Sequence, residues 1–357
     1  MSLDYTKTAR RHGWSQVPAG VVRALGQALD SAVIHASPPV GAGFGGQYAG
    51  DVRLADGRRV FVKAAPPWIA YQASCLELEA AVLRRLPSSV PHCRPLARVS
   101  RDGWALLALE HVDGTMPGFP WSLEHLDAVY ASCLALSRVR APTTYTERPW
   151  GPYFHRGDRH GADIREIRSG SCRRPAAHGD NPWLDAMVSA HGAELADLAD
   201  ASRTITGPHL LHQDVRPDNI LVDRRGRARL VDWNWVCLGP AWVDFVGLLP
   251  MAHRQGLDVT PWLEARLFTG ATDDVIDAVL AAIAVKMLGG QHEPLPPGMP
   301  ETLWQHKLLQ AHDAVLLLAD RRGWKVRSME RGPGATRPEA TADSTDRRSV
   351  EPATAPA

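Results

Sequence analysis

Residues 210–222 read Leu-Leu-His-Gln-Asp-Val-Arg-Pro-Asp-Asn-Ile-Leu-Val, a polar loop between two short apolar runs that are typical of strands. Within this loop, Asp214 offers a carboxylate and Asn219 a carboxamide. Reactive side chains concentrate in loops that rigid strands hold in place. A carboxylate at such a position can accept a proton from an attacking hydroxyl, and a carboxamide oxygen can bind Mg²⁺.

A second carboxylate follows the loop. Asp232 comes directly after the predicted strand 229–231, where it could bind Mg²⁺ together with phosphate oxygens. Taken separately, an Asp after a strand is more often a turn former or a cap than a metal ligand. The joint order and spacing of Asp214, Asn219 and Asp232 reverse that judgement, because His-x-Asp-x-x-x-x-Asn followed by a further Asp is a kinase pattern.

The composition is that of an ordinary globular protein. The chain has 357 residues, 45% of them hydrophobic, and its length predicts about two domains or lobes. The formal net charge is +1, from 40 basic and 39 acidic residues, which disfavours binding to nucleic acid or to an anionic membrane. Residues 1–15 lack the apolar run of a secretory signal, and the stretch 275–287 is too short to span a bilayer, so we expect a cytoplasmic protein.

Residues 31–113 show strand and helix patterns in close succession. Short β-like runs lie at 32–35, 48–54 and 59–64, the last two joined across Asp56-Gly57, a strong hairpin signal. A helical pattern follows at 71–86, and two more strands flank Asp102-Gly103. This order predicts an antiparallel sheet with one packed helix, preceded by a helical extension over residues 1–30.

Residues 114–326 are mainly helical in pattern. Apolar residues at helical spacing predict helices at 123–137, 182–198, 243–252, 273–288 and 301–322, with short strands around the polar loop. The segment 142–180 is rich in Gly, Arg, Pro and His and is predicted to be an irregular insert with a use such as substrate contact. Residues 327–357 contain no aromatic residue and are predicted to be a disordered tail.

These motifs resemble the aminoglycoside phosphotransferase family of small-molecule kinases, which is related to choline kinase. The resemblance extends over nearly the whole chain to about Trp324, and its most specific parts are the loop 212–219 and the Asp232-Trp233 pair. It implies an α+β, protein-kinase-like two-lobed fold. In this fold a small antiparallel-sheet N-lobe with one packed helix binds the nucleotide, and a larger, mainly helical C-lobe carries the catalytic loop, the metal site and the substrate site.

The resemblance also implies a role for each matched residue. Asp214 would be the catalytic base, and Asn219 and Asp232 would be the ligands of Mg²⁺. Asp244, in the segment 239–245, would brace the catalytic loop, and we expect His212 to be a structural residue buried beneath it.

Three positions depart from the family pattern. Gln213 stands where small-molecule kinases often have glycine, and Arg216 where they often have His or Lys. Arg216 is a candidate contact for the transferring phosphate. Asn234 replaces the glycine of the Asp-Phe-Gly triplet. None of these changes removes a group that phosphoryl transfer requires.

The predicted sheet supplies candidate nucleotide contacts. Lys63 lies in the apolar run Val-Phe-Val-Lys and resembles the phosphate-binding lysine of kinases. A half-buried lysine needs a partner, for which Glu79 in the following helix is preferred and Glu77 is the alternative. Residues 106–114 resemble the hinge between lobes, where backbone groups of Glu110 and Val112 would pair with the nucleobase of ATP or GTP.

A glycine-rich turn precedes the second predicted strand. Gly41, Gly43 and Gly46 satisfy Gly-x-Gly-x-x-Gly, which alone also fits a dinucleotide-binding fold. A dinucleotide fingerprint leads into a helix, whereas this one leads into the strand 48–54, which favours a phosphate-covering loop. A plain turn remains an equal alternative at this point.

The sequence therefore predicts a Mg²⁺-dependent enzyme that moves the γ-phosphate of ATP or GTP to a hydroxyl of a small molecule. A nucleotide-binding pseudokinase is the alternative, and a protein kinase is disfavoured because no activation segment ending in Ala-Pro-Glu is recognisable. The basic balance of residues 142–180 favours a neutral, sugar-like or anionic acceptor over a polycationic antibiotic. The identity of the acceptor and the oligomeric state stay open.

Overall fold

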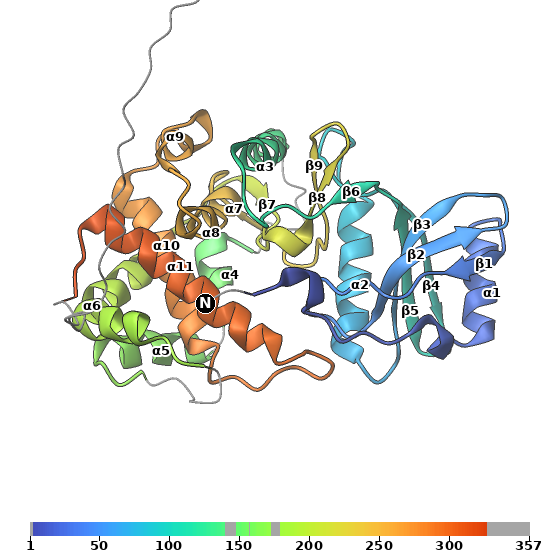
Figure 1. Cartoon of the computed structure of the whole chain (residues 1–357), viewed down its shortest axis with the longest axis horizontal. Coiled ribbons are helices and arrows are strands. Elements are labelled where there is room, and N and C mark those ends of the chain that lie inside the picture. The colour runs from blue at the N-terminus through green and yellow to red at the C-terminus, as the bar shows by residue number, and fades with distance from the viewer. Residues whose placement is uncertain (1–2, 140–147, 157, 173–178, 327–357) are drawn as a thin grey trace, which may run out of the picture. The chain divides into compact units, whose positions relative to one another are not determined.

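The computed structural model describes residues 3–139, 148–156, 158–172 and 179–326 (Figure 1). It has the predicted α+β fold, with a five-stranded antiparallel sheet followed by a mainly helical region. Met1–Lys325 form one compact unit, so the division into lobes between residues 113 and 114 stays a prediction. The predicted tail, 327–357, lies outside the described residues.

The sheet has the strand order β1-β2-β3-β5-β4. Its strands are β1 (Val33–Ala36), β2 (Tyr48–Leu54), β3 (Arg59–Ala65), β4 (Pro95–Arg101) and β5 (Trp104–Glu110). Side chains alternate between the faces of a strand, so neighbouring residues of β3 meet different partners. Val62 packs into the cluster that contains Val21 and Leu25 of α1 (Ala19–Ala28), whereas Lys63 pairs with Glu79 on α2 (Ala70–Leu83).

The N-terminal extension is only partly helical, which corrects the prediction for residues 1–30. The α-helix covers Ala19–Ala28, and the preceding segment contains two short 3-10 turns, Tyr5–Lys7 and Trp14–Gln16. The backbone of this segment bonds to the glycine-rich turn, from Ala9 N to Gly41 O at 2.8 Å and from His12 N to Gly46 O at 2.9 Å. The backbone N–H groups of Ala9 and His12 are therefore not available for hydrogen bonds within a helix. We call residues 3–18 the N-terminal strap.

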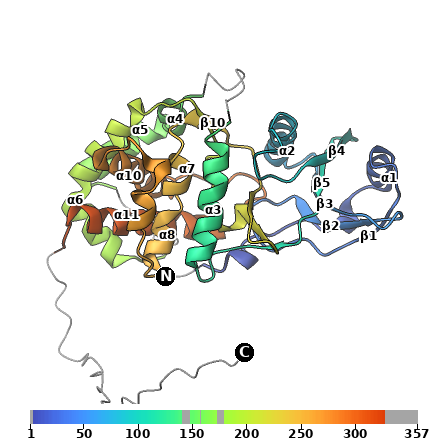
Figure 2. The same cartoon turned by 90° about the horizontal axis from the view of Figure 1, so that it is seen from above.

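The larger helices match the predicted ranges closely. They are α3 (Leu123–Leu136), α6 (Pro182–Ala201), α10 (Asp273–Gly289) and α11 (Thr302–Arg322) (Figure 1, Figure 2). The predicted N-cap Thr272 accepts from Val275 N and starts α10, whose residues are buried almost all round. The range 243–252 divides into α7 (Val243–Val246) and α8 (Leu249–Arg254), and α9 (Thr260–Leu263) follows. Among the described residues, every helix is too short or too polar to cross a lipid bilayer.

The segment 142–180 is not wholly irregular, which corrects a second prediction. Its described parts include α4 (Trp150–Phe154) and α5 (Asp158–Arg168), and α5 packs against α6 and α10. Ile164 and Ile167 anchor α5 in the core, but two apolar residues in one helix are too few to produce a visible periodicity. Residues 140–147, 157 and 173–178 lie outside the description.

Two small sheets hold the polar loop. β7 (His209–Leu211) pairs with β10 (Cys237–Gly239), and β8 (Ile220–Asp223) pairs with β6 (Gly114–Thr115) and β9 (Ala228–Leu230). The loop 212–219 therefore leaves one sheet and enters the other, which fixes both of its ends. Asp232 follows β9 and is brought beside this loop.

Candidate active site

The side chains of the loop 212–219 orient Asp214 from two sides. Asp214 Oδ1 accepts from Nη1 of Arg216 at 2.7 Å, and Oδ2 accepts from Nδ2 of Asn219 at 2.8 Å. Nε of Arg216 donates to Asp218 at 2.9 Å, and its guanidinium lies 5.1 Å from the ring centre of Phe44. Burial raises the pKa of Asp214 to about 6 against the opposing charge of Arg216, so the carboxylate is ionised at neutral pH.

The backbone of the loop is supported from below by a buried carboxylate. Asp244 on α7 accepts from the backbone N–H groups of His212 and Gln213, each at 2.7 Å. The fully buried ring of His212 lies edge-on to Trp233, and burial lowers its pKa to about 4, which keeps it neutral. Gln213 has φ +68°, a left-handed conformation that glycine adopts freely. The departure from glycine at this position therefore carries backbone strain next to Asp214.

Lys63 joins the sheet to the segment that follows β9. Its Nζ lies 2.9 and 2.7 Å from the two carboxylate oxygens of Glu79 and 2.9 Å from Oδ1 of Asp232. Burial acts to lower the pKa of Lys63, but the two carboxylates outweigh it and raise the pKa. Glu77, the alternative partner, instead pairs with Arg98 on the surface at 2.6 Å.

The residues proposed for Mg²⁺ have the right free atoms. Both hydrogen bonds of the Asn219 side chain come from Nδ2, one to the carboxylate and one to the backbone oxygen of Asp214. Within the described residues its Oδ1 accepts no hydrogen bond, so this oxygen is available to a metal ion. Oδ1 of Asp232 accepts from Lys63 and Asn234, so Oδ2 is the oxygen without a hydrogen bond in the described part of the chain. Two such oxygens, completed by phosphate oxygens, match the ligands that Mg²⁺ prefers.

One cavity of about 270 Å³ lies between the sheet and the catalytic loop. Apolar side chains such as Phe61, Leu109 and Leu221 line it, and Lys63, Asn219 and Asp232 lie at its polar end. Its edge includes the predicted hinge residues Glu110 and Val112. The apolar lining suits a nucleobase, and the charged and polar lining residues suit its phosphates.

The Glu110 side chain is occupied elsewhere. Its carboxylate accepts from Arg94 and Arg229, both at 2.7 Å. The sequence analysis expects only the backbone groups of Glu110 and Val112 to contact the nucleobase. The ion pairs of Glu110 involve its side chain alone, so they are compatible with that contact.

The three predicted glycines differ in their surroundings. Gly43, with φ +92°, lines the 270 Å³ cavity. A Cβ atom at Gly41 would collide with the carbonyl oxygen of Thr6, and one at Gly46 would lie 2.7 Å from that of Gly298. Two of the glycines therefore allow close packing of other backbone segments, and β2 after them excludes the helix of a dinucleotide fingerprint.

Arg11 of the N-terminal strap lies inside the glycine-rich turn, in a position that no sequence motif predicts. Its guanidinium donates to four carbonyl oxygens at 2.7 to 3.2 Å, those of Val40, Ala42, Gly45 and Gln47. Burial lowers the pKa of Arg11, while Asp232 and Asp218 act to raise it. All three residues line the 270 Å³ cavity. The strap thus fixes the turn from within.

The strap also contacts the helical region. Thr8 Oγ1 donates to Gly43 O at 2.7 Å, and the Thr8 carbonyl accepts from Thr302 of α11 at 2.7 Å. The Tyr5 hydroxyl bonds to Nδ1 of His306 at 2.7 Å, and the Tyr5 ring packs edge-on against Phe44. These contacts tie the glycine-rich turn to α11.

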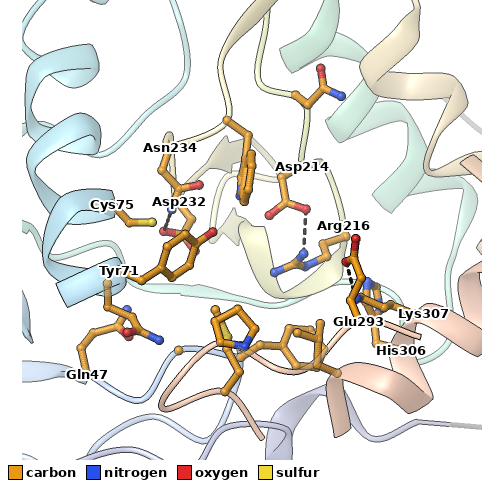
Figure 3. A pocket seen from close by; sticks show the side chains of 18 of the residues that line it. Gln47, Tyr71, Cys75, Asp214, Arg216, Asp232, Asn234, Glu293, His306 and Lys307 are labelled. Atoms are coloured by element: carbon orange, nitrogen blue, oxygen red, sulfur yellow. Dashed lines mark hydrogen bonds and ion pairs between the residues drawn. The ribbon is translucent and has the colours of Figure 1, made fainter. Parts of the chain in front are cut away.

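A second cavity, of about 350 Å³, opens on the other side of Asp214. Figure 3 shows Asp214 and Arg216 on one side, Tyr71 and Cys75 of α2 on another, and Lys307 of α11 beside Glu293. Asp232 and Arg11 line both cavities. The catalytic loop therefore lies where the two cavities meet.

The profile of the phosphotransferase enzyme family APH matches residues 43–278, more than half of the chain. The chain belongs to this phosphotransferase family. The match begins at Gly43 and includes Lys63, the catalytic loop and Asp244. It confirms the resemblance on which the roles of these residues were predicted, while the roles themselves stay predictions.

Among the solved structures that resemble this chain, one supports the family fold. An aminoglycoside phosphotransferase from Alicyclobacillus acidocaldarius is 17% identical with a TM-score of 0.52, covering 86% of this chain and 96% of that chain. A macrolide 2'-phosphotransferase from Brachybacterium faecium is 15% identical with a TM-score of 0.48, covering 90% and 100%. At 17% identity, the similarity to the Alicyclobacillus structure shows a shared fold and nothing more.

Human serine/threonine-protein kinase 32C is 48% identical over 40 residues, which are 11% of this chain and 8% of that protein. The chain thus matches only a small part of this relative.

Proposed function

We propose that this family member transfers the γ-phosphate of ATP or GTP to a hydroxyl of a small molecule, with Mg²⁺ as the metal. The observation that carries the proposal is the meeting of Lys63, Asp214, Asn219 and Asp232 at the junction of two cavities. One cavity has the apolar walls that a nucleobase needs. The other is lined by Asp214 and is the proposed site of the acceptor.

The chemistry follows from these positions. The acceptor oxygen forms a bond to the γ-phosphorus while the bond from that phosphorus to the β-phosphate oxygen breaks, and the hydroxyl proton passes to Asp214. Lys63 positions the triphosphate, and Arg216, beside Asp214, contacts the transferring phosphoryl group. When bound by Asn219 and Asp232, Mg²⁺ supplies positive charge that stabilises the phosphate oxygens. Catalysis is then positioning and charge neutralisation.

The partner proposed for this enzyme is a small-molecule acceptor, with neither nucleic acid nor a membrane. The near-zero net charge supports this part of the proposal. Action in the cytoplasm is a further part of the proposal.

Asp214→Asn tests the proposal. Asparagine keeps the shape of the side chain but cannot accept the proton, so we expect kcat to fall by about 10²- to 10⁴-fold while nucleotide affinity is kept. Release of ADP with Mg²⁺, ATP and a library of hydroxyl compounds is the assay, with the exposed Asp200→Asn as the matched control. Undiminished turnover in Asp214→Asn would exclude the assignment. Wild-type protein that binds ATP without transfer to any acceptor would support a pseudokinase.

A further inference from the structure

The 350 Å³ cavity beside Asp214, here called the acceptor cavity, contains a half-buried cation without a carboxylate partner among the described residues. Lys286, near the end of α10, is the one charged residue in that helix's last turn. Its Nζ donates to the carbonyl oxygen of Phe154 at 2.6 Å and lies 4.3 Å from the Phe154 ring centre. Among the described residues, no carboxylate oxygen lies within 4.0 Å of this ammonium group. This half-buried ammonium has one neutral acceptor among the described residues, so two of its three donors are left for a ligand.

A second cation lies near the first. The guanidinium of Arg156, after α4, stacks 3.7 Å from the ring centre of Tyr153 and lies 5.3 Å from that of Trp235. Its Nη1 donates to the Tyr153 carbonyl at 2.7 Å. Within the described ranges it has no ion pair either, and its charge acts on Lys286. The Arg156 side chain is exposed, so water weakens the repulsion between the two cations, and an anion bound beside both would offset what remains of it.

The acidic side chains of the cavity are already engaged. Asp214 bonds to Arg216 and Asp232 to Lys63, as the catalytic geometry requires. The carboxylate of Glu293, on the rim, lies 3.7 Å from Lys307. A polycationic acceptor would therefore meet repulsion from Lys286 and Arg156 with little free negative charge to offset it.

We propose that the acceptor of this phosphotransferase carries an anionic group, a carboxylate or a phosphate, which Lys286 and Arg156 bind while the acceptor's hydroxyl faces Asp214. The proposal rests on the proposed function, since it names the substrate class of the same site. Phe154 and Met287 line this cavity and also a smaller one that includes Asp214, so the anion subsite adjoins the catalytic carboxylate. The aromatic surfaces of Phe154 and Trp235 suit a flat apolar body between the two polar ends.

The environment of Lys286 supports a functional use. Burial, followed by the charge of Arg156, lowers its pKa to about 8. A lysine with only the task of capping its own helix would bond to the last carbonyls of α10. Lys286 instead reaches a carbonyl of α4, so its charge is held at the cavity wall.

Three acceptors of one shape test the proposal. 4-(Hydroxymethyl)benzoate, 1,4-benzenedimethanol and 4-(aminomethyl)benzyl alcohol share a ring and a hydroxymethyl group and carry charges of −1, 0 and +1. Their dissociation constants are measured by calorimetry at pH 7 on the full chain saturated with Mg²⁺ and a non-hydrolysable ATP analogue. We expect the anion to bind about tenfold or more tightly than the cation, with the neutral diol between them.

Variants locate the effect. Lys286→Met should abolish the preference for the anion, Lys286→Arg should keep most of it, and the exposed Lys325→Met is the matched control. Arg156→Met, at a side chain without an ion pair in the described ranges, should weaken the preference and gives a second test if Lys286→Met does not fold. Equal or tighter binding of the cation, no binding of the anion, or a preference that survives in Lys286→Met would overturn the proposal.

The two proposals fail in different ways. If the neutral or cationic alcohol is phosphorylated at least as efficiently as the benzoate in an Asp214-dependent reaction, the anionic acceptor is wrong and the phosphotransferase function stands. If the chain binds the benzoate through Lys286 but wild type and Asp214→Asn release ADP equally, the phosphotransferase assignment is wrong.

Discussion

Replacing Lys63 by methionine should destabilise the protein because it isolates a buried negative charge. The side chains of Lys63 and Glu79 are 8% and 1% exposed, and their charged atoms are 2.7 Å apart at the closest. Removing one partner of a buried ion pair costs about 3–5 kcal/mol of the free energy of unfolding. Most of this cost comes from Glu79, since the Asp232 side chain is 32% exposed and stays hydrated.

A double variant separates this cause from a loss of packing. In Lys63→Met with Glu79→Leu the unpaired charge of Glu79 is removed as well, so most of the lost stability should return. A deficit of about 1 kcal/mol is expected to remain, because the Asp232 backbone N–H loses its acceptor, Oε1 of Glu79 at 3.2 Å. Arg98→Met is the matched control. Arg98 pairs with Glu77, which lies on the same helix as Glu79, and the two side chains are 42% and 51% exposed. Losing this exposed pair should lower the free energy of unfolding by less than about 1 kcal/mol.

The pH dependence of Lys63→Met supplies a further check. Burial already raises the pKa of Glu79 above its ordinary value of 4.5, and removing Lys63 raises it more. The folded variant then binds a proton that the unfolded chain releases, so its stability increases as the pH falls from neutral toward 4.5 and is lost as the pH rises. Urea unfolding followed by tryptophan fluorescence at pH 7 and pH 5 measures this. The reasoning is refuted if Lys63→Met loses no more stability than Arg98→Met, or if the double variant is no more stable than Lys63→Met.

Three more predictions concern the catalytic loop, the strap and the acceptor cavity. Gln213→Gly should change the free energy of unfolding by no more than about 1 kcal/mol, because glycine adopts φ +68° freely. Gln213→Val should lower it by about 1–3 kcal/mol, because a branched side chain resists this conformation. Equal urea midpoints for the two variants would contradict this reasoning. Arg11→Gln should weaken ATP binding about tenfold, because the glycine-rich turn loses hydrogen bonds that hold it. Arg10→Gln, at an exposed position, should leave the affinity for ATP measured by calorimetry unchanged. A similar effect of both variants would exclude the role of Arg11. The preference for the benzoate should fade as the pH rises through about 8, where Lys286 loses its charge, and a preference undiminished at pH 9 would count against Lys286 as the anion ligand.

The catalytic loop and its partners are predictable from the sequence because their residue types and spacing are specific. The loop 212–219, Lys63 and Asp232 form recognisable motifs, and Glu79, the preferred partner of Lys63, lies 2.7 Å from it. The strands and long helices were predictable from their periodicity and turn residues, as in the hairpin at Asp56-Gly57. The short helices α4 and α5 were not predictable, since α4 has only five residues and α5 has too few apolar residues to show a helical period.

The acceptor cavity and the strap required the tertiary structure. Arg11 and Gly43 are brought together by contacts between segments about thirty residues apart, and Arg156 and Lys286 are more than a hundred residues apart in the chain. Neither pair has a local pattern, because long-range contacts depend on how helices and loops pack and leave no fixed spacing in the sequence. The sequence by itself determined the reaction chemistry, since the phosphate-handling groups lie in short motifs with fixed spacing. Only the tertiary structure determined the charge of the acceptor site, because the cations that face it come from separate elements.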